Sequence, residues 1–375
     1  MQARRPARRN RPLTFESAAA ARRARLVEHL DAIGALHDPA WRHAVSVVPR
    51  HRLVPEFYRR EPFGRWRTVT RDSPDYLPGI YADQPLTTQL TDGNPTSSSS
   101  QPGLMLPILE ALEVGDATRV LEVATGTGYN AALLSERLGS DRVTSIEVDP
   151  ELAGLARRRL ADCGYTPTVV TGDGRAGHPA GAPYDALIAT CGFVRIPEAW
   201  PAQLRPGGVI VCPVGWANIR LVVRDARRAE GRFLPMGSYF MAVRDAGTTG
   251  TVDYPGTPEQ ADERPAVLGP GGPFGDDALD FLLSVAVPGT RLAAERRSGG
   301  AITVCRLWAP DGSWARVEHG TARQAGPRRL WDAVETAYGI YLEYGRPERE
   351  RFGMTVTGAD QRVWLDTPAG PTWHL

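Results

Sequence analysis

The stretch from Val120 to Asn130, which reads VLEVATGTGYN, decides the fold of this chain. A short apolar run carries an acidic residue, Glu122, and passes through two glycines, Gly126 and Gly128, into a segment with helical spacing. Glycine lets the backbone approach a ligand closely, and the first turn of a helix offers N–H groups that have no partner inside the helix. The pattern predicts a strand, a tight turn and a helix that together bind a nucleotide-like cofactor.

Acidic residues around this turn favour S-adenosyl-L-methionine over a nicotinamide dinucleotide as the cofactor. Glu147 ends the next predicted strand, where a carboxylate accepts hydrogen bonds from both hydroxyls of a ribose. Asp173, between two glycines after the third strand, is placed to receive the exocyclic amine of an adenine. Glu122 suits a cationic amino group, because a carboxylate next to a pyrophosphate is repelled. A dinucleotide-binding turn also prefers glycine where Ala131 stands; a turn without any ligand is the third interpretation.

Strand-like and helical runs alternate regularly between residues 119 and 215, and the helices begin near Asn130, Pro150 and Pro197. This alternation is typical of a parallel sheet with helices on both faces. We therefore predict an α/β fold, the Rossmann-like, doubly wound sheet of class I methyltransferases. The runs LVVRDAR and GRFLPMGSYFMAVRD predict antiparallel strands at the edge of this sheet, and the polar stretch TDGNPTSSSSQ predicts a loop.

Composition divides the chain into three predicted parts. Residues 1–25 are rich in Arg, Ala and Pro and predict a disordered basic tail. Residues 26–245 form the predicted S-adenosylmethionine-dependent methyltransferase domain. A segment rich in Gly, Pro, Thr and Asp begins near Gly247 and reads as a linker. We therefore expect residues 246–375 to form a smaller α+β accessory domain.

The overall composition excludes several classes of partner. The net charge of the 375 residues is +1, so no global field attracts the chain to nucleic acid or to an anionic membrane. No apolar run approaches the roughly 20 residues that a membrane helix needs, and the N-terminus lacks the apolar stretch of a signal peptide. We therefore expect a cytoplasmic protein. The four cysteines are widely spaced without a CxxC pair, so we expect no metal site.

Several motifs follow one another in a fixed order: VPRHRLVPE, YADQPL, SQPGLM, VLEVATGTGYNAALLSERLG, GDG, PYDALIAT and IPEAWPAQLRPGGVIVCPVG. In this order, from about Leu26 to Val243, the chain resembles the protein-L-isoaspartate O-methyltransferases. The resemblance implies methyl transfer to the carboxylate of an aspartyl residue in a peptide or protein. It also implies that the cofactor is surrounded by Glu122, Gly126, Thr127, Gly128, Tyr129, Asn130, Glu147, Asp173, Gly174 and Thr190.

The resemblance places the acceptor site on the serine run that precedes Pro102. Ser100 takes the position of the family's active-site serine, and Ser98, Ser99 and Gln101 beside it complete the expected catalytic segment. A carboxylate has a pKa near 4 and is already ionised at neutral pH, so the reaction needs no general base. Hydroxyl and amide donors from this segment would hold the acceptor in place. A flexible surface loop is the alternative interpretation of the serine run, and we expect His51 to be structural.

Two departures from the family pattern suggest a particular branch. Ser98-Ser99-Ser100 stands where the family has Thr-Ile-Ser, and about 130 residues follow its usual end. Both features resemble the branch associated with ribosomally synthesised peptides such as lanthipeptides and graspetides. That branch implies methylation of a normal aspartate in a cyclised precursor peptide, which then closes to aspartimide, with the accessory domain holding the peptide. The alternatives are a protein-L-isoaspartate repair enzyme and, in another class, a cofactor-binding regulatory protein without turnover.

Overall fold

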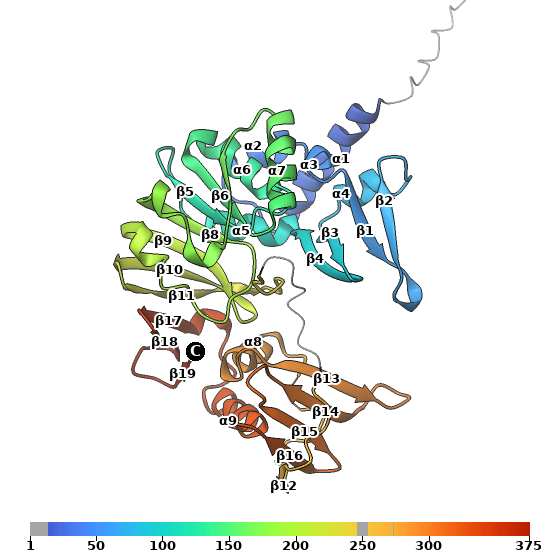
Figure 1. Ribbon diagram of the computed structural model, residues 1–375, viewed down its shortest axis with the longest axis vertical. Helices are drawn as coiled ribbons and strands as arrows, with labels where there is room; N and C mark the ends of the chain where they lie inside the picture. The colour runs from blue at the N-terminus through green and yellow to red at the C-terminus, as the bar shows by residue number, and fades with distance from the viewer. Residues whose placement is uncertain (1–13, 246–253, 273) are drawn as a thin grey trace, which may run out of the picture.

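The computed structural model describes residues 14–245, 254–272 and 274–375, which build three sheets and the helices around them (Figure 1). The largest sheet has ten strands in the order β19-β18-β17-β11-β10-β9-β8-β5-β6-β7. Its parallel half consists of β5 (Val120–Val123), β6 (Val143–Glu147), β7 (Thr168–Thr171), β8 (Tyr184–Ala189) and β9 (Leu204–Val214). The α/β fold, the Rossmann-like doubly wound sheet and the antiparallel pairing of the strands that follow its parallel half are thereby confirmed, but further strands lie beyond them at the edge.

Alternate residues of the parallel strands face two separate hydrophobic cores. Val120 and Ile188 belong to one core, whereas their neighbours Leu121 and Leu187 belong to the other. This alternation follows from the two-residue period of a strand and explains why these short runs are apolar throughout. Helices on the first face are α1 (Phe15–Ala32), α2 (Pro39–Val47), α5 (Pro102–Glu110), α6 (Tyr129–Leu138) and α7 (Pro150–Asp162).

The second face is covered differently from our expectation. No regular helix begins near Pro197; the structure has only the short 3-10 turn η5 (Pro201–Gln203), because closely spaced prolines prevent a longer helix. Trp200, which is fully buried, packs there together with helix α8 (Asp277–Ala286) from far along the chain. The sheet is therefore closed on this side by the C-terminal region.

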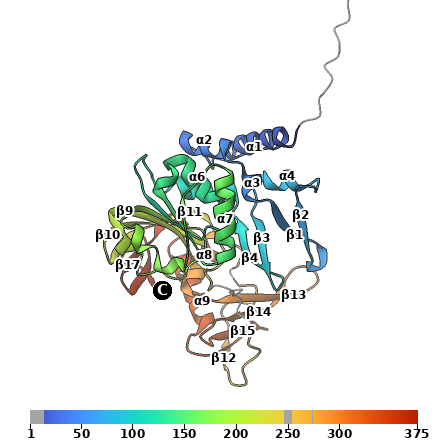
Figure 2. The same cartoon turned by 45° about the horizontal axis from the view of Figure 1, so that its top comes forward.

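The prediction of a disordered tail over residues 1–25 is wrong for the second half of this segment, which is helical. Helix α1 begins at Phe15, and the Thr14 hydroxyl caps it by accepting a hydrogen bond from the Ser17 N–H. Alanine and arginine favour helix, and Leu26 and Leu30 bury its inner side. Figure 2 shows α1 beside α2, close to α6. Residues 1–13 lie outside the described part of the chain.

The serine run is a strand and not the loop that we expected. A small sheet in the order β2-β1-β3-β4 contains β1 (Glu56–Arg60), β2 (Trp66–Thr70), β3 (Leu86–Thr91) and β4 (Asn94–Ser99). Asp92 and Gly93 join β3 to β4, and both have a positive φ, the geometry of a tight hairpin turn. The pairing with β3 holds the serines in an extended conformation. The short helices α3 (Arg50–Leu53) and α4 (Tyr76–Ile80) accompany this sheet.

The expected boundary at residue 246 separates only part of the C-terminal region. A five-stranded sheet, β12-β16-β15-β14-β13, is covered by α9 (Leu330–Glu343) and contains β12 (Asp262–Pro265), β13 (Arg291–Arg296), β14 (Ile302–Trp308), β15 (Trp314–Glu318) and β16 (Thr321–Ala325). We call this sheet, with α8 and α9, the accessory unit.

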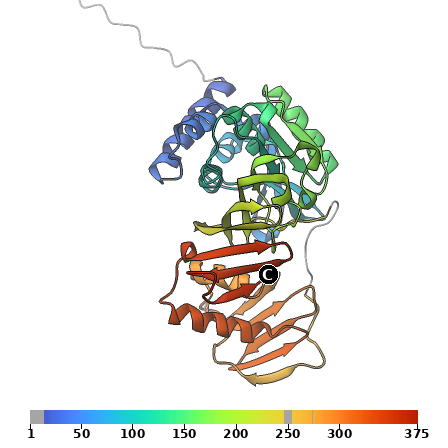
Figure 3. The same ribbon diagram turned by 90° about the vertical axis from the view of Figure 1, so that its left-hand side faces the viewer.

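The last strands return to the large sheet, so the prediction of one separate domain to residue 375 is wrong. Strand β17 (Phe352–Thr357) pairs with β11 (Arg228–Gly237), which pairs with β10 (Ala217–Asp225); β18 (Asp360–Leu365) and β19 (Thr372–His374) extend the edge. Figure 3 shows β17, β18 and β19 next to the methyltransferase sheet. This pairing covers the edge of β11, and both regions share one core. Within the described residues, no helix has the length and apolarity to cross a bilayer.

Candidate functional site

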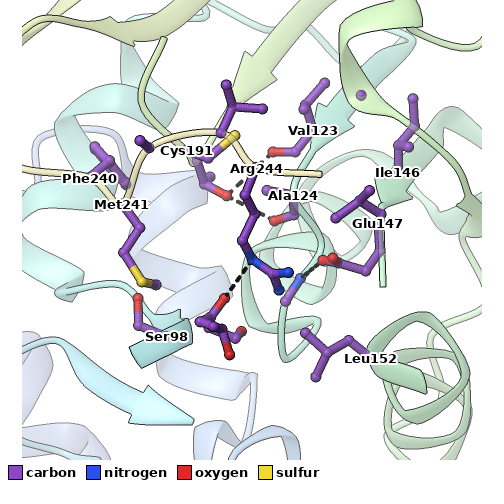
Figure 4. Close-up of a pocket in the computed structure, with 18 of the residues that line it drawn as sticks. Ser98, Val123, Ala124, Ile146, Glu147, Leu152, Cys191, Phe240, Met241 and Arg244 are labelled. Carbon is purple, nitrogen blue, oxygen red and sulfur yellow. Dashed lines mark hydrogen bonds between the residues drawn. The ribbon is translucent and has the colours of Figure 1, made fainter. Parts of the chain in front are cut away.

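A cavity of about 500 Å³ opens at the carboxyl ends of the parallel strands (Figure 4). Ligands of doubly wound sheets bind at this edge, where the strand order reverses on either side of the first strand. Its wall contains five of the ten residues that we expected around the cofactor: Gly126, Glu147, Asp173, Gly174 and Thr190. The volume lies in the range that is usual for small-molecule sites.

The turn after β5 is shaped by three residues with a positive φ. Ala124 has a φ of 74°, Gly126 of 54° and Gly128 of 88°. The Gly126 N–H donates to Glu147 Oε2 at 2.8 Å, and the Asp149 N–H donates to Glu147 Oε1 at 3.1 Å. Both carboxylate oxygens are thus oriented by backbone, and burial raises the pKa of the Glu147 carboxyl. The geometry holds this carboxylate at the cavity wall, with lone pairs left for hydroxyl groups of a ligand.

Glu122 and Gly128 lie behind the turn and not in the cavity wall. Glu122 is fully buried and accepts hydrogen bonds from the Asn130 amide at 2.7 Å and from the Ser145 hydroxyl; burial raises the pKa of its carboxyl to about 7. A Cβ on Gly128 would lie 3.2 Å from Leu160 Cγ, so this glycine serves the packing of α7. We expected Glu122 and Gly128 to contact the cofactor directly, but neither residue lines the cavity.

Asp173 and Thr190 both line the cavity and follow strands that lie on either side of β5 in the sheet order. Asp173 caps the turn η3 (Gly174–Ala176) and forms an ion pair with Arg175, which also binds Asp245. The Thr190 hydroxyl donates to the Ala124 carbonyl at 2.9 Å. Because Thr190 also lines the neighbouring groove, it marks the passage between the two spaces.

A groove of about 660 Å³ adjoins the cavity and contains most of the expected catalytic segment. Ser98, Ser100 and Gln101 line it, and the groove shares Ser98, Thr190 and Met241 with the cavity. A smaller space behind Ser98, Ser99 and Ser100 is lined by Thr127, Tyr129 and Asn130 of the glycine turn. The structure thus brings the serine run directly against the glycine turn, although the two segments are well separated in the sequence.

 A Cβ on Gly126 would lie only 3.6 Å from the Ser98 carbonyl oxygen, which measures how close the two segments are.

Ser99, the fourth residue of the expected catalytic segment, points away from the groove toward a residue that the sequence analysis missed. Arg50 is completely buried, and its guanidinium donates to the Ser99 hydroxyl at 3.2 Å and to the carbonyls of Ser99 and Ser100 at 3.3 and 3.0 Å. It also donates to the Ile80 carbonyl at 2.9 Å. Arg50 therefore fixes the backbone of the serine run, and its position in VPRHRLVPE was the available signal.

Asp83 is a second residue that the sequence analysis missed. Its Oδ1 accepts from the Gly103 N–H at 2.6 Å, and its Oδ2 accepts from the Gln101 amide at 3.1 Å. A Cβ on Gly103 would lie 2.5 Å from Asp83 Oδ2, which explains the glycine at the start of α5. Asp83 lies in the motif YADQPL, and its place in this motif was the signal. His51, as expected, has a structural contact, between its Nδ1 and the Tyr81 hydroxyl at 2.7 Å.

The segment from Ser238 to Asp245, which we call the strap, crosses the mouth of the cavity. We expected it to continue a strand, but β11 ends at Gly237, and the strap pairs instead with Gly192 through hydrogen bonds of 2.8 Å at Met241 and Val243. Figure 4 shows Arg244 extending from the strap into the cavity, where its Nε donates to the Thr96 carbonyl at 3.3 Å. Its charge lowers the pKa of Glu147 against the larger effect of burial.

The chemistry of this site is that of positioned hydrogen-bond donors and acceptors. Within the described residues, no group of three or more His, Cys, Asp or Glu side chains is arranged to hold a metal ion. The cavity offers a fixed carboxylate, Glu147, for hydroxyl groups, and the groove offers hydroxyl and amide donors for an anion. These features fit a cofactor with ribose hydroxyls in the cavity and a carboxylate acceptor in the groove.

A doubly wound sheet, the glycine turn after β5 and an acidic residue at the end of β6 define a class I S-adenosylmethionine-dependent methyltransferase. The chain belongs to the protein-L-isoaspartate(D-aspartate) O-methyltransferase family, whose sequence model matches residues 21–238. It is therefore an O-methyltransferase that acts on aspartyl residues of proteins or peptides, with S-adenosyl-L-methionine as the methyl donor.

Similarity to individual proteins agrees with this assignment. The chain is 35% identical to a protein-L-isoaspartate O-methyltransferase of Methanosarcina mazei over 52% of its length and 72% of that protein. It is 37% identical to the one of Methylorubrum extorquens, over 56% of this chain and 82% of that protein. A solved protein-L-isoaspartate O-methyltransferase shares the fold with a TM-score of 0.54 and 21% identity, covering 92% of this chain and 100% of the other. The common fold thus extends beyond residue 238.

Proposed function

We propose that this enzyme methylates the free carboxylate of an isoaspartyl residue in a peptide or protein. The observation that carries this proposal is the continuity of the cavity and the groove, which share Ser98 and Thr190 in their walls. A cofactor in the cavity and a carboxylate in the groove would meet at these two side chains. Family membership and the curated relatives support the isoaspartyl acceptor.

In this proposal the cofactor is held by residues on three sides of the cavity. Glu147 would accept hydrogen bonds from the ribose hydroxyls, and Asp173 with Gly174 would contact the adenine. Gly126 and Thr190 would border the methionine portion, where the backbone of the turn allows close approach. The cofactor supplies an electrophilic methyl group. Glu122 would act indirectly, by holding Asn130 at the start of α6.

The acceptor would be positioned by the serine run. Ser98 and Ser100 donate hydroxyl hydrogen bonds and Gln101 its amide, which orients a carboxylate without neutralising it. Correct placement of two reactants supplies roughly 7–11 kcal/mol of a barrier. The strap residue Phe240 lines both spaces, so its apolar ring would help to exclude water from their junction, which strengthens the attraction between charges there.

A second candidate is methylation of a normal aspartate in a cyclised peptide, with aspartimide as the later product. The observation in favour is the serine run, because the three consecutive hydroxyl side chains of Ser98 to Ser100 differ from the Thr-Ile-Ser of the family. The long C-terminal region carries less weight, since the fold similarity to a protein-L-isoaspartate O-methyltransferase covers 92% of this chain. The class of a cofactor-binding protein without turnover is the third outcome of the test.

The test is an incubation with S-adenosylmethionine labelled on its methyl group and three matched peptides. The peptides carry an isoaspartyl residue, a normal aspartate in a linear chain, or a normal aspartate in a ring. Base-labile label on the isoaspartyl peptide is the expected result. Label on the ring alone would replace the proposal by the second candidate, and calorimetric binding of the cofactor without label on any peptide would favour a regulatory protein.

A further inference from the structure

A second cleft, of about 320 Å³, lies between the methyltransferase sheet and the accessory unit. Its wall is largely apolar and includes Val194, Trp216, Phe240, Leu283 and Leu292. It is continuous with the functional site, because Phe240, Ala242 and Arg291 line both this cleft and the cofactor cavity. We call it the interdomain cleft. None of its lining residues carries a role in the proposed reaction except the strap, which forms the partition.

Apolar side chains that remain exposed are concentrated around this cleft and the acceptor groove. Val194, Trp216 and Leu292 are 45%, 38% and 43% exposed in the cleft, and Ile33, Tyr239 and Met241 are 51%, 63% and 37% exposed along the groove. These six are more than half of the eleven large exposed hydrophobic side chains in the described part of the chain. Gathered apolar surface of this kind marks a binding surface, whereas scattered single residues do not.

Contacts from the accessory unit hold the surface between groove and cleft. The Tyr239 hydroxyl donates to Asp277 at 3.1 Å at the start of α8, and its ring packs on Trp216 with centroids 5.5 Å apart. The backbone N–H of Trp216 in turn donates to the Ser284 hydroxyl at 3.0 Å. The two aromatic side chains are therefore fixed before any ligand arrives, which lowers the entropic cost of binding on them.

We propose that the interdomain cleft is a side-chain subsite for the polypeptide substrate. It takes a large apolar side chain, aromatic or branched aliphatic, of the same chain whose carboxylate enters the acceptor groove. The inference rests on the proposed function, because a polypeptide acceptor must continue beyond the groove and the exposed path over Tyr239 and Trp216 leads to the cleft. Asp280 lines the cleft, and an acidic side chain of a ligand would lie close to this carboxyl group, which disfavours it there.

The experiment compares isoaspartyl peptides in which one Trp replaces Gly at each position in turn on either side of the acceptor. We expect the wild-type enzyme to show about tenfold higher kcat/KM for at least one Trp position than for the all-Gly peptide, through a lower KM, because burying a large apolar side chain is worth at least this much. Leu292→Asp should remove this advantage while leaving kcat on the all-Gly peptide unchanged.

The matched control is Leu342→Asp on α9, because Leu342 is 45% exposed, almost the same as Leu292, and stands outside the wall of the cleft. This variant should keep the full preference for Trp. Where circular dichroism shows that Leu292→Asp is unfolded, Val194→Asp on the opposite wall takes its place.

Three results would overturn the inference. A wild-type enzyme that methylates all peptides equally well lacks the subsite although its proposed function stands. Equal loss with Leu292→Asp for Trp and all-Gly peptides would also count against the subsite. A dimer in sedimentation that Leu292→Asp dissociates would assign the cleft to a second copy of the chain. If the enzyme labels no isoaspartyl peptide at all, the proposed function fails first, and this inference falls with it.

Discussion

The guanidinium of Arg50 makes several hydrogen bonds that hold the backbone of the serine run. We therefore expect Arg50→Lys to lower both the stability of the protein and its turnover. Arg50 donates to the Ile80 carbonyl at 2.9 Å, to the Ser100 carbonyl at 3.0 Å and to the carbonyl and hydroxyl oxygens of Ser99. Lysine keeps the charge but offers one nitrogen in place of a planar fork of three. A single ammonium cannot reach carbonyls on opposite sides of the fork.

The magnitude follows from the bonds that lysine loses. Arg50 is 0% exposed, so water does not replace a lost partner. A buried acceptor without a partner costs about 1–3 kcal/mol, and a hydrogen bond from a charged donor contributes about 1.5–3 kcal/mol. With one of the two shortest bonds lost, to Ile80 or to Ser100, we expect the free energy of unfolding to fall by about 2–4 kcal/mol. Since the backbone at Ser100 is then held less firmly, turnover should fall by about a hundredfold, as it does for small misplacements of a reacting group.

Urea unfolding and labelled methyl transfer to the isoaspartyl peptide measure the two effects, and calorimetry should show unchanged affinity for the cofactor. Arg52→Lys is the matched control in the same short helix, because the Arg52 side chain is 50% exposed and forms an ion pair with Glu16 at 3.3 Å.

 
The reasoning is refuted if Arg50→Lys unfolds at the same urea concentration as the wild type and keeps its turnover.

Three further predictions concern the turn, the acceptor segment and the buried acid. Ala124→Gly should stabilise the protein by about 0.5–1 kcal/mol in urea unfolding. Ala124 has a φ of 74°, a conformation that costs a residue with a Cβ about 1–2 kcal/mol, and the greater flexibility of glycine in the unfolded chain offsets part of this gain. Ser100→Ala should lower kcat at least about tenfold in the labelled transfer assay without changing the Kd of the cofactor in calorimetry, because only the acceptor loses a donor. The buried Glu122 carboxyl has its pKa raised from 4.5 to about 7, so the folded protein binds this proton more tightly than the unfolded chain does. This contribution to stability is complete below pH 4.5 and is lost as the pH rises to about 7, at up to roughly 1.4 kcal/mol per pH unit, and Glu122→Gln should remove that slope from unfolding free energies measured across the range.

Each of these has an outcome that contradicts it. If Ala124→Gly is less stable than the wild type, the packing of the Ala124 methyl group stabilises the protein by more than the backbone strain at this position destabilises it. Unchanged turnover of Ser100→Ala would show that the acceptor is held elsewhere, with Ser98→Ala as the comparison. An equal pH slope in Glu122→Gln and wild type would assign the slope to other groups, of which Glu147, whose pKa is also raised, is the first to examine.

The sequence predicted the parts of the site that are built from neighbouring residues. Gly126, Glu147, Asp173, Gly174 and Thr190 line the cavity as expected, because each stands at or shortly after the end of a strand of one parallel sheet and those strand ends meet at one edge. The motif could not show which side chains of the turn face the cavity. Glu122 and Gly128 were assigned to the cofactor, but one faces Asn130 and Ser145 behind the turn and the other packs on α7.

Contacts between distant segments left no local pattern to recognise. Arg50 lies 50 residues before Ser100, and although it belongs to the motif VPRHRLVPE, nothing local distinguishes this buried arginine from its half-exposed neighbour Arg52. The hairpin of β3 and β4 was missed for a related reason. Its polar strand has the composition of a loop, and only pairing with β3 and burial of Thr96, Ser97 and Ser99 make it a strand.

By itself, then, VLEVATGTGYN determined a strand, a turn and a helix, because apolar β-formers, two glycines and a helix-forming run specify their backbone locally. Tertiary structure alone decided what surrounds that turn. Strands β17 to β19 joined the large sheet because the edge of β11 was open to pairing more than a hundred residues along the chain. The strap and the interdomain cleft likewise arise from the packing of the accessory unit on the sheet, which depends on long-range burial and follows no sequence period.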